Sequence, residues 1–355
     1  MTLRRFPLLT TTIGAFPKPD YVKVPDWFRH GGPSTEDPTC GGAAFPAEIG
    51  GEVDEMLTRG TRDAVLDQVT AGIDVPTDGE IRRENYIHYH CRHLEGIDFD
   101  RLTEKTMRAG SWTARVPTIT GPIKAGAPFL TRDWRIAQEA TDRPVKITVP
   151  GPLTVADTIA DAYYGDERKV AAALAAAVNA EIRALAEAGC RWIQVDEPLF
   201  ARWPDKALAY GIENLERCFH GAADTVVRTL HMCCGYPSKL DQEDYPKADR
   251  QAYFTLADAL DGTSIQAVSI EDAHRPNDLG LLERFTTSRV ILGTVAIAKT
   301  RVETVEEIAG RIEAALGHID AERLIVAPDC GLGMLDRDTA LAKLSNMTAA
   351  ARAVA

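Results

Sequence analysis

The stretch ERKVAAALAAAVNAEIRALAEAGCRWIQVD, residues 167–196, contains the repeating unit that decides the fold. Its first part, Glu167–Ala188, has the alanine and leucine spacing of a helix that packs one face against a sheet. Glu181, Arg183 and Glu187 interrupt the apolar run from Val170 to Gly189, which indicates an amphipathic helix rather than a membrane span. The short run Trp192–Asp196 that follows is typical of a strand. A helix followed by a strand is the building block of an α/β fold.

The same alternation continues along the rest of the chain. The expected strands are Thr10–Phe16, Ile73–Asp78, Val145–Val149, Trp192–Asp196, Val226–Met232, Ala267–Ile270, Val290–Val295 and Leu324–Ala327. The expected helices are Ala47–Ala71, Glu167–Ala188, Gly211–His220, Lys247–Ala259, Leu279–Thr286, Val302–Leu316 and Arg337–Val354. Strands alternating with helices, without a break in composition, predict one domain over residues 1–355, a single α/β (βα)8 TIM barrel. An open, doubly wound sheet is the alternative.

Two stretches depart from this repeat. Lys18–Gly50, with GGPSTEDPTCGG at its centre, predicts an extended loop after strand 1, and loops of that length are commonly lids or binding loops. Between Glu84 and Ile136, tyrosines, histidines and scattered glycines predict a hairpin-like excursion after strand 2.

The composition excludes several classes of protein. A chain of 355 residues with 45% hydrophobic and 26% charged residues is typical of a soluble globular enzyme. The net charge of -12 argues against a nucleic-acid partner. No stretch reaches the roughly 20 apolar residues of a membrane span, and the N-terminal apolar run is too short for a secretory signal. Seven widely spaced cysteines are an odd number, which favours free thiols over disulfides. We therefore expect a cytoplasmic enzyme for a small molecule.

Three expected strand ends carry residues that suit a metal ion. In LHMCCG, His231 and Cys233 are two residues apart and therefore point to the same face of an extended strand. Glu271 follows the sixth strand, and Cys330 follows the eighth. The carboxyl ends of barrel strands meet at one rim, so one imidazole, two thiolates and one carboxylate predict a tetrahedral Zn2+ site. A buried histidine and buried cysteines without a metal are the simpler explanation of any one residue, but three strand ends together favour zinc.

These ligands suggest a reaction. Zinc binds a thiol as its thiolate and so keeps a soft nucleophile available at neutral pH. Such a reaction needs an exchangeable coordination position, and Glu271 is the ligand expected to yield because oxygen matches zinc least well among the four. The sequence therefore predicts a zinc-dependent methyltransferase or alkyltransferase that acts on a thiol.

Six short motifs now resemble one known family, the cobalamin-independent methionine synthases and their shorter core relatives among the uroporphyrinogen decarboxylase-like barrels. They are TTTIGAFP at 10–17, DGE at 78–80, IQVDEP at 193–198, LHMC at 230–233, SIED at 269–272 and PDCG at 328–331. The resemblance runs from Thr10 to the C-terminus, about the length of the catalytic half alone. It implies transfer of a methyl group to L-homocysteine, forming methionine.

The resemblance also implies roles for substrate residues. Glu80 and Asp196 would hold the amino group of a homocysteine-like substrate, and the backbone of Ile13, Gly14 and Ala15 would hold its carboxylate. Two carboxylates at one rim suit an ammonium group. The structural alternative is that Asp196 caps a helix and that Glu80 pairs with Arg82 or Arg83. Glu197 points away from Asp196 on an extended chain and is the more structural of the two.

Three departures from the family concern the methyl donor. The serine of the family's opening motif is Ala15 here, the expected pterin-stacking tryptophan aligns near Thr158, and the expected histidine after the seventh strand is Ala298. The donor therefore stays open between methylfolate and a methyl corrinoid protein.

The histidine-rich segment NYIHYHCRHLEG invites a second metal hypothesis. His88 and His90 would share a strand face, with Cys91 and His93 nearby. Interleaved tyrosines favour the simpler interpretation, a hairpin whose polar face lines the rim.

Two alternatives to methionine formation stay open. One is a zinc-dependent alkyltransferase or lyase that acts on another small thiol, such as a coenzyme M-like acceptor. The other is a non-catalytic barrel with a structural zinc ion, which a closed four-ligand site would support.

Overall fold

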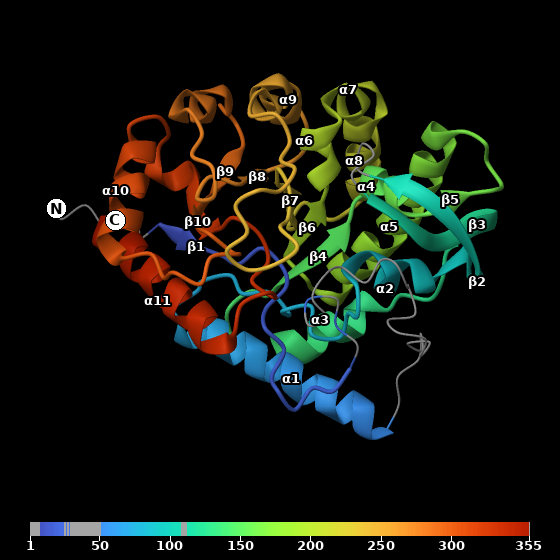
Figure 1. The fold of residues 1–355 in the computed structure, drawn as a ribbon, viewed down its shortest axis with the longest axis horizontal. Helices are drawn as coiled ribbons and strands as arrows, with labels where there is room; N and C mark the ends of the chain where they lie inside the picture. The colour runs from blue at the N-terminus through green and yellow to red at the C-terminus, as the bar shows by residue number, and fades with distance from the viewer. Residues whose placement is uncertain (1–7, 25, 27, 29–50, 108–111, 355) are drawn as a thin grey trace.

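The computed structural model describes residues 8–24, 26, 28, 51–107 and 112–354. Most of the expected loop Lys18–Gly50 therefore lies outside the described residues. The centre of the molecule is a curled sheet of seven parallel strands, which Figure 1 shows between the surrounding helices. In sheet order, these strands are β1 (Leu9–Thr10), β10 (Leu324–Pro328), β9 (Arg289–Val295), β8 (Ala267–Ile270), β7 (Val227–Met232), β6 (Trp192–Asp196) and β4 (Lys146–Pro150). The chain thus has an α/β fold with a curled parallel sheet, consistent with a TIM-like barrel.

The segment between β1 and β4 differs from the expected strand Ile73–Asp78. It forms no regular strand and makes only two parallel bridges, Thr11 to Val75 and Thr77 to Lys146. At Thr77 the Gln68 side chain takes the place of a neighbouring strand's backbone. It accepts a hydrogen bond from the Thr77 N–H at 2.9 Å and donates one to the Thr77 carbonyl at 3.0 Å. The expected strand Thr10–Phe16 is likewise shortened to Leu9–Thr10.

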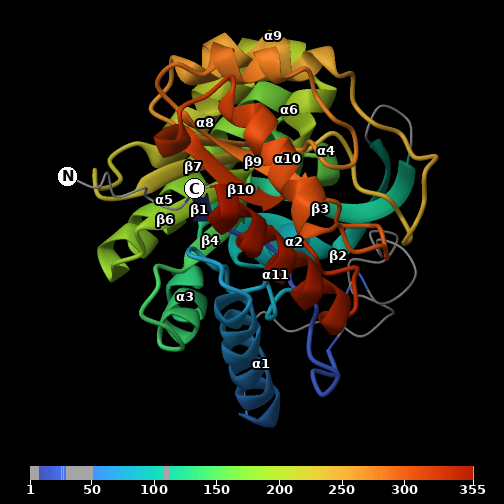
Figure 2. The same ribbon diagram turned by 90° about the vertical axis from the view of Figure 1, so that its left-hand side faces the viewer.

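Helices cover the outside of the sheet, as Figures 1 and 2 show. The longer ones are α1 (Gly51–Thr70), α3 (Leu130–Gln138), α5 (Glu167–Ala188), α8 (Ile212–Phe219), α9 (Gln251–Asp261), α10 (Val305–Leu316) and α11 (Arg337–Val354). Shorter ones are α2 (Tyr86–Arg92), α4 (Pro152–Thr158), α6 (Pro198–Arg202), α7 (Pro204–Lys206), a π-helix at Ala207–Gly211, and 3-10 helices at Leu279–Arg284 and Ala321–Arg323. The α-helix expected over Leu279–Thr286 is therefore a shorter 3-10 helix. No helix in the described ranges is long and apolar enough to cross a membrane.

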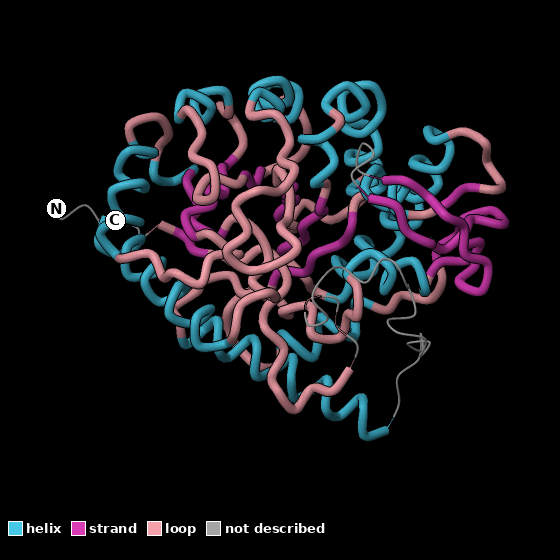
Figure 3. Tube along the Cα trace, in the orientation of Figure 1, coloured by secondary structure: helices cyan, strands magenta, loops and turns pink. Residues whose placement is uncertain are grey.

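A second, smaller sheet stands at one side of the molecule, where Figure 3 shows it apart from the central strands. It consists of β2 (Leu94–Met107) and β3 (Trp112–Ala125), which pair antiparallel, and of β5 (Ala160–Asp161), which pairs parallel with β3. This pair lies in the stretch where the sequence predicts an excursion. The segment before it is helical rather than extended, because the Asn85 side chain accepts from the N–H groups of Ile87 and His88 and starts α2.

The inner face of the curled sheet carries its own apolar cluster. Its buried members are Ile13, Val75, Trp192, Ala267, Ile291, Ile325 and Ala327, and they come from segments all around the sheet. A much larger cluster lies between the sheet and the helices that cover it. The core thus has two layers, one on each face of the central sheet. Polar side chains lie beyond the inner layer, at the carboxyl ends of the strands.

Candidate active site

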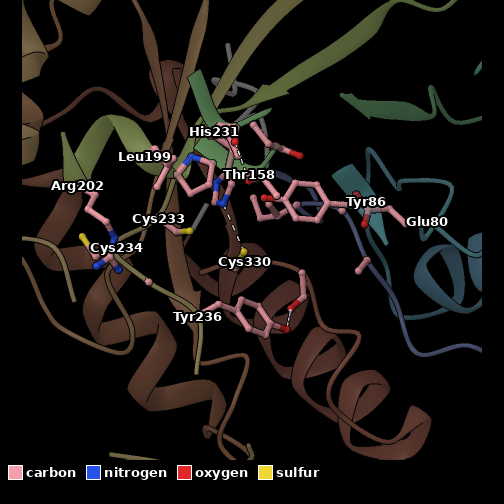
Figure 4. A pocket seen from close by; sticks show the side chains of 18 of the residues that line it. Glu80, Tyr86, Thr158, Leu199, Arg202, His231, Cys233, Cys234, Tyr236 and Cys330 are labelled. Carbon is pink, nitrogen blue, oxygen red and sulfur yellow. Dashed lines mark hydrogen bonds between the residues drawn. The ribbon is translucent and has the colours of Figure 1, made fainter. Parts of the chain in front are cut away.

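Three of the expected metal ligands meet at the carboxyl ends of β7 and β10. The metal-binding atoms of His231, Cys233 and Cys330 all lie within 4.8 Å of one another. Figure 4 shows the imidazole and the two sulfurs pointing toward one another, and His231 Nε2 is 3.5 Å from Cys330 Sγ. The two cysteines come from strands that are not neighbours in the sheet, so only the curling of the sheet brings them together.

The orientation of His231 is set by a neighbouring strand. Its Nδ1 lies 2.9 Å from the Ser269 hydroxyl on β8, so Nε2 is the nitrogen left facing the sulfurs. Metal-bound histidines are commonly held in this way through the nitrogen that does not bind the metal. The Cys330 thiol and the His231 imidazole hold the pKa of the Cys233 thiol well below its usual range. Cys233 is therefore prepared to act as a thiolate ligand.

The fourth expected ligand, Glu271, lies outside this triad. Its Oε1 is 2.6 Å from Lys247 Nζ, and its Oε2 accepts from the Cys234 N–H at 3.1 Å. Its carboxylate instead lies within 4.8 Å of His274 and Asp329. The structure thus brings together three of the four expected ligands and pairs the fourth with a lysine.

Asp329, which precedes the candidate ligand Cys330, has a role that the sequence did not suggest. Its carboxylate accepts from the backbone N–H groups of Asp272, Ala273 and His274 at 2.7–2.9 Å and lies 2.7 Å from His274 Nδ1. It therefore ties the end of β10 to the loop after β8. The only signal in the sequence is an acidic residue next to a candidate ligand in PDCG.

We expect Asp329→Ala to lower the free energy of unfolding by about 2–4 kcal/mol, because three N–H groups would lose their acceptor in a buried place. Chemical denaturation measures this change. Asp329→Asn, which keeps one acceptor oxygen, should lose less. The fully exposed Asp224 provides the control, since Asp224→Ala should change stability by less than about 0.5 kcal/mol. Equal stability of the two alanine variants would contradict the role of Asp329.

The residues expected to bind the substrate line the same pocket as the triad. Ile13, Gly14 and Ala15 form one part of its wall, and Glu80 and Asp196 form another. Its other lining residues are Phe28, Tyr86, Thr154, Thr158, Pro198, Leu199, Arg202, His231, Cys233, Cys234, Gly235, Tyr236, Cys330 and Gly331. The pocket therefore joins a candidate metal centre to a pair of carboxylates.

Glu80 is held in an unusual conformation. Its φ of 55° is in the left-handed region that non-glycine residues rarely adopt. Its Oε1 accepts from Thr148 Oγ1 at 2.6 Å and from Arg83 Nη1 at 3.1 Å. A Cβ atom at Gly14 would stand 2.7 Å from that oxygen, so the close approach needs a glycine there. The structure therefore shows the pairing with Arg83, rather than Arg82, and places Glu80 in the pocket wall as well.

Asp196 is held by a buried network that the sequence did not reveal. Gln194 Nε2 donates to Asp196 Oδ1 at 2.7 Å and to the Ile13 carbonyl at 2.8 Å, and Lys146 Nζ donates to Gln194 Oε1 at 2.6 Å. Burial raises the pKa of Asp196 to about 7. Gln194 thus connects the two walls of the pocket that are expected to bind the two ends of an amino acid.

Glu197 accepts hydrogen bonds from the first residues of α4. Its carboxylate accepts from the N–H groups of Leu153 and Thr154 at 2.8 and 2.9 Å and from Thr154 Oγ1 at 2.7 Å. This arrangement agrees with the more structural role expected of Glu197. Asp196, in contrast, is not the residue that precedes α6, because that position is occupied by Glu197.

The three departures from the family lie in different places. Ala15 and Thr158 line the pocket. Ala298 is buried, and its N–H lies 3.4 Å from the His274 ring. Apolar and aromatic side chains make up much of the remaining wall, including Phe28, Tyr86 and Leu199.

The histidine-rich segment does not form the expected strand. His88 and His90 lie on helix α2, where residues two apart point in different directions, so the shared strand face predicted for these two histidines is wrong. The three histidines and Cys91 form no metal-binding group among the described residues. Both ring nitrogens of His88 are buried and have no hydrogen-bond partner in the described part of the chain. Burial lowers the pKa of His88 to about 3.

This histidine predicts acid sensitivity. The unfolded chain binds a proton at His88 near pH 6.5 while the folded chain does not, so stability falls as the pH drops from about 6.5 toward 3. His88→Leu should lose less stability than the parent over this range, whereas exposed His220→Gln should not differ from it. Unfolding curves recorded across this pH range test the expectation. A parallel pH dependence of His88→Leu and parent would contradict it.

Comparisons with known proteins agree with this geometry. Residues 47–353 match the family described as "Cobalamin-independent synthase, Catalytic domain". The chain is similar to the methionine synthases of Sulfolobus acidocaldarius and Thermococcus kodakarensis, each 29% identical, covering 96% of this chain and 90% or 91% of the relative. Its fold resembles a B12-independent methionine synthase of Shewanella sp. W3-18-1, solved in complex with selenomethionine, with 28% identity, a TM-score of 0.85 and 98% coverage of both chains.

Proposed function

Since the chain belongs to the cobalamin-independent methionine synthase family, a family of methyltransferases that act on homocysteine, we propose that it forms methionine with a zinc ion held by His231, Cys233 and Cys330. The convergence of these three side chains in one pocket carries the proposal. An imidazole and two thiolates are the donor set that zinc prefers. The ion would lower the pKa of the bound substrate thiol and keep it nucleophilic.

Three protein ligands favour a catalytic zinc over a structural one. Structural zinc sites are closed by four protein ligands, whereas catalytic sites keep a position for water or substrate. Glu271 is proposed as an exchangeable fourth ligand, which supports the triad when no thiol is bound. Its present pairing with Lys247 is compatible with exchange, since the carboxylate has a second partner.

Glu80 and Asp196 are proposed to bind the substrate ammonium group, and the backbone of Ile13, Gly14 and Ala15 to bind its carboxylate. Their place in one pocket with the triad supports this assignment. Both hydrogen bonds to Glu80 described above go to Oε1, which is compatible with an ammonium bound at Oε2. These residues would orient the substrate so that its thiol lies toward His231 and the cysteines.

The paired carboxylates also favour homocysteine over a coenzyme M-like acceptor. A sulfonate carries a negative charge and no ammonium group, so Glu80 and Asp196 would repel it. The proposed donor is methylfolate or a methyl corrinoid protein. A panel of methyl donors, each with homocysteine as acceptor, would discriminate between them.

We also propose that residues 1–355 form one catalytic (βα)8 barrel, in which residues 73–77 take the second strand position. The two parallel bridges on either side of this segment support closure of the ring. The packing of the last helix, α11, against both α10 and α1 supports it as well.

X-ray absorption at the zinc edge tests the proposed function. The zinc-loaded protein should show two sulfur ligands, and a third should appear when L-homocysteine is added. Coenzyme M at the same concentration should add none. A protein that binds no zinc, or that gains no sulfur ligand from homocysteine, would refute the proposal.

A further inference from the structure

One ion pair beside the triad, between Lys247 and Glu271, has a lysine to which the proposed function assigns no role. We propose that Lys247 is a positioning residue that holds the Glu271 carboxylate away from the metal and thereby keeps a coordination position free for the substrate thiol. This inference rests on the proposed zinc site.

The first argument is that both carboxylate oxygens of Glu271 already accept hydrogen bonds. Each of its two carboxylate oxygens has its own partner, Oε1 the Lys247 ammonium at 2.6 Å and Oε2 the Cys234 N–H at 3.1 Å. The side chains of Glu271 and Lys247 are only 4% and 16% exposed. An ion pair with so little access to water is screened less than a surface pair, so it competes effectively with another cation for the same carboxylate.

The second argument is the placement of Lys247. The expected helix Lys247–Ala259 begins only at Gln251, which leaves Lys247 in the loop before α9. The next residue, Ala248, donates its N–H to the Cys234 carbonyl at 2.7 Å, and Lys247 Nζ lies 4.9 Å from the centre of the Tyr245 ring. The lysine is therefore anchored to the same loop that carries Cys233.

The third argument is that the backbone of Glu271 is fixed. The Glu271 N–H donates to the Tyr253 hydroxyl at 3.2 Å, and that hydroxyl donates to the Met232 carbonyl at 3.1 Å. The Tyr253 hydroxyl, which comes from α9, therefore links the carboxyl ends of β7 and β8. A change of partner by Glu271 would therefore involve its side chain, while its backbone stays tied to Tyr253.

These contacts define two states of one side chain. In the first state, Glu271 pairs with Lys247, and three ligands remain for the metal. In the second state, Glu271 binds the metal and Lys247 loses its partner. A substrate thiol competes with Glu271 for the same position, so a lysine that stabilises the first state favours substrate binding at the expense of metal affinity.

The test compares Lys247→Met with the parent in two measurements, zinc affinity by competition with a chromophoric chelator and homocysteine affinity by calorimetry. We expect Lys247→Met to bind zinc about tenfold more tightly without substrate, and to bind homocysteine about tenfold more weakly, as loss of a partly buried ion pair would give. Zinc-edge X-ray absorption of this variant should show an additional oxygen ligand. Lys247→Arg should resemble the parent, and exposed Lys239→Met is the control for loss of a surface charge.

A double variant separates positioning from general structural damage. In a Glu271→Gln background, Lys247→Met should change neither affinity, because the carboxylate that it releases is absent. If Lys247→Met does not fold, Lys247→Gln takes its place in both backgrounds. Unchanged affinities and unchanged coordination in Lys247→Met, or equal effects in both backgrounds, would overturn the inference. Failure of the parent to bind zinc would instead refute the proposed function.

Discussion

Replacing Cys233 or Cys330 by serine is expected to reduce bound zinc from about one ion per chain to a small fraction of that, and to abolish methyl transfer. In the proposed zinc site each cysteine would supply one of the two soft ligands, and a serine hydroxyl is neither ionised at neutral pH nor soft enough to replace a thiolate. Metal analysis after dialysis against a chelator measures the zinc content. Methyl transfer, followed with whichever donor supports turnover in the parent, should fall with it.

The chain supplies its own control for this prediction in the adjacent Cys234. Its sulfur points away from the triad in Figure 4, and burial raises its pKa to about 11, so it is a poor metal ligand. Cys234→Ser should therefore keep about one zinc ion per chain. Equal zinc loss in all three serine variants would mean that the sulfurs matter for folding rather than for binding. Undamaged protein that never holds zinc would remove the metal centre altogether.

Asp196→Asn and Glu80→Gln should each weaken homocysteine binding by about 1–3 kcal/mol, or roughly five- to 150-fold in the dissociation constant. Each substitution keeps the shape of the side chain and removes one negative charge facing the proposed ammonium site. Calorimetry with zinc-loaded protein measures the affinity. The measurement belongs at a pH above about 7, because burial raises the pKa of Asp196 to that value and only the ionised carboxylate attracts an ammonium group.

Glu197→Gln is the matched control for this pair. The residue is adjacent to Asp196 and equally acidic, but its carboxylate accepts three hydrogen bonds at the start of α4. It should lower the free energy of unfolding and leave the dissociation constant of homocysteine within about twofold of the parent. If Asp196→Asn and Glu80→Gln also leave it unchanged, both carboxylates are structural and the substrate assignment fails.

Local pattern predicted the regular elements well. Trp192–Asp196, Ala267–Ile270, Glu167–Ala188 and Arg337–Val354 agree with the structure to the residue. The prediction failed where side chains replace the regular backbone pairing. Gln68 makes the hydrogen bonds that a strand around Thr77 would make, and Asn85 starts a helix where alternating tyrosines and histidines indicated a strand.

The same distinction applies to the active site. His231 and Cys233 were predictable because residues two apart on an extended chain face the same side, and Cys330 was predictable because barrel strands end at one rim. The hydrogen-bond partners of three acidic residues were not predictable. Glu271 contacts Lys247, Asp329 contacts the backbone of residues 272–274, and Asp196 contacts Gln194. These contacts depend on distance and burial in the folded chain.

The amino-acid sequence by itself thus determined most of the alternating strands and helices, the family resemblance and the candidate metal ligands, because each depends on local periodicity or on short motifs. Only the tertiary structure decided what those side chains contact. It paired Glu271 with Lys247 and connected Asp196 to Ile13 through Gln194, and it buried His88 with no hydrogen-bond partner among the described residues. The physical reason is that hydrogen bonds and ion pairs act over a few ångströms of space, and folding sets that proximity between residues distant in the chain.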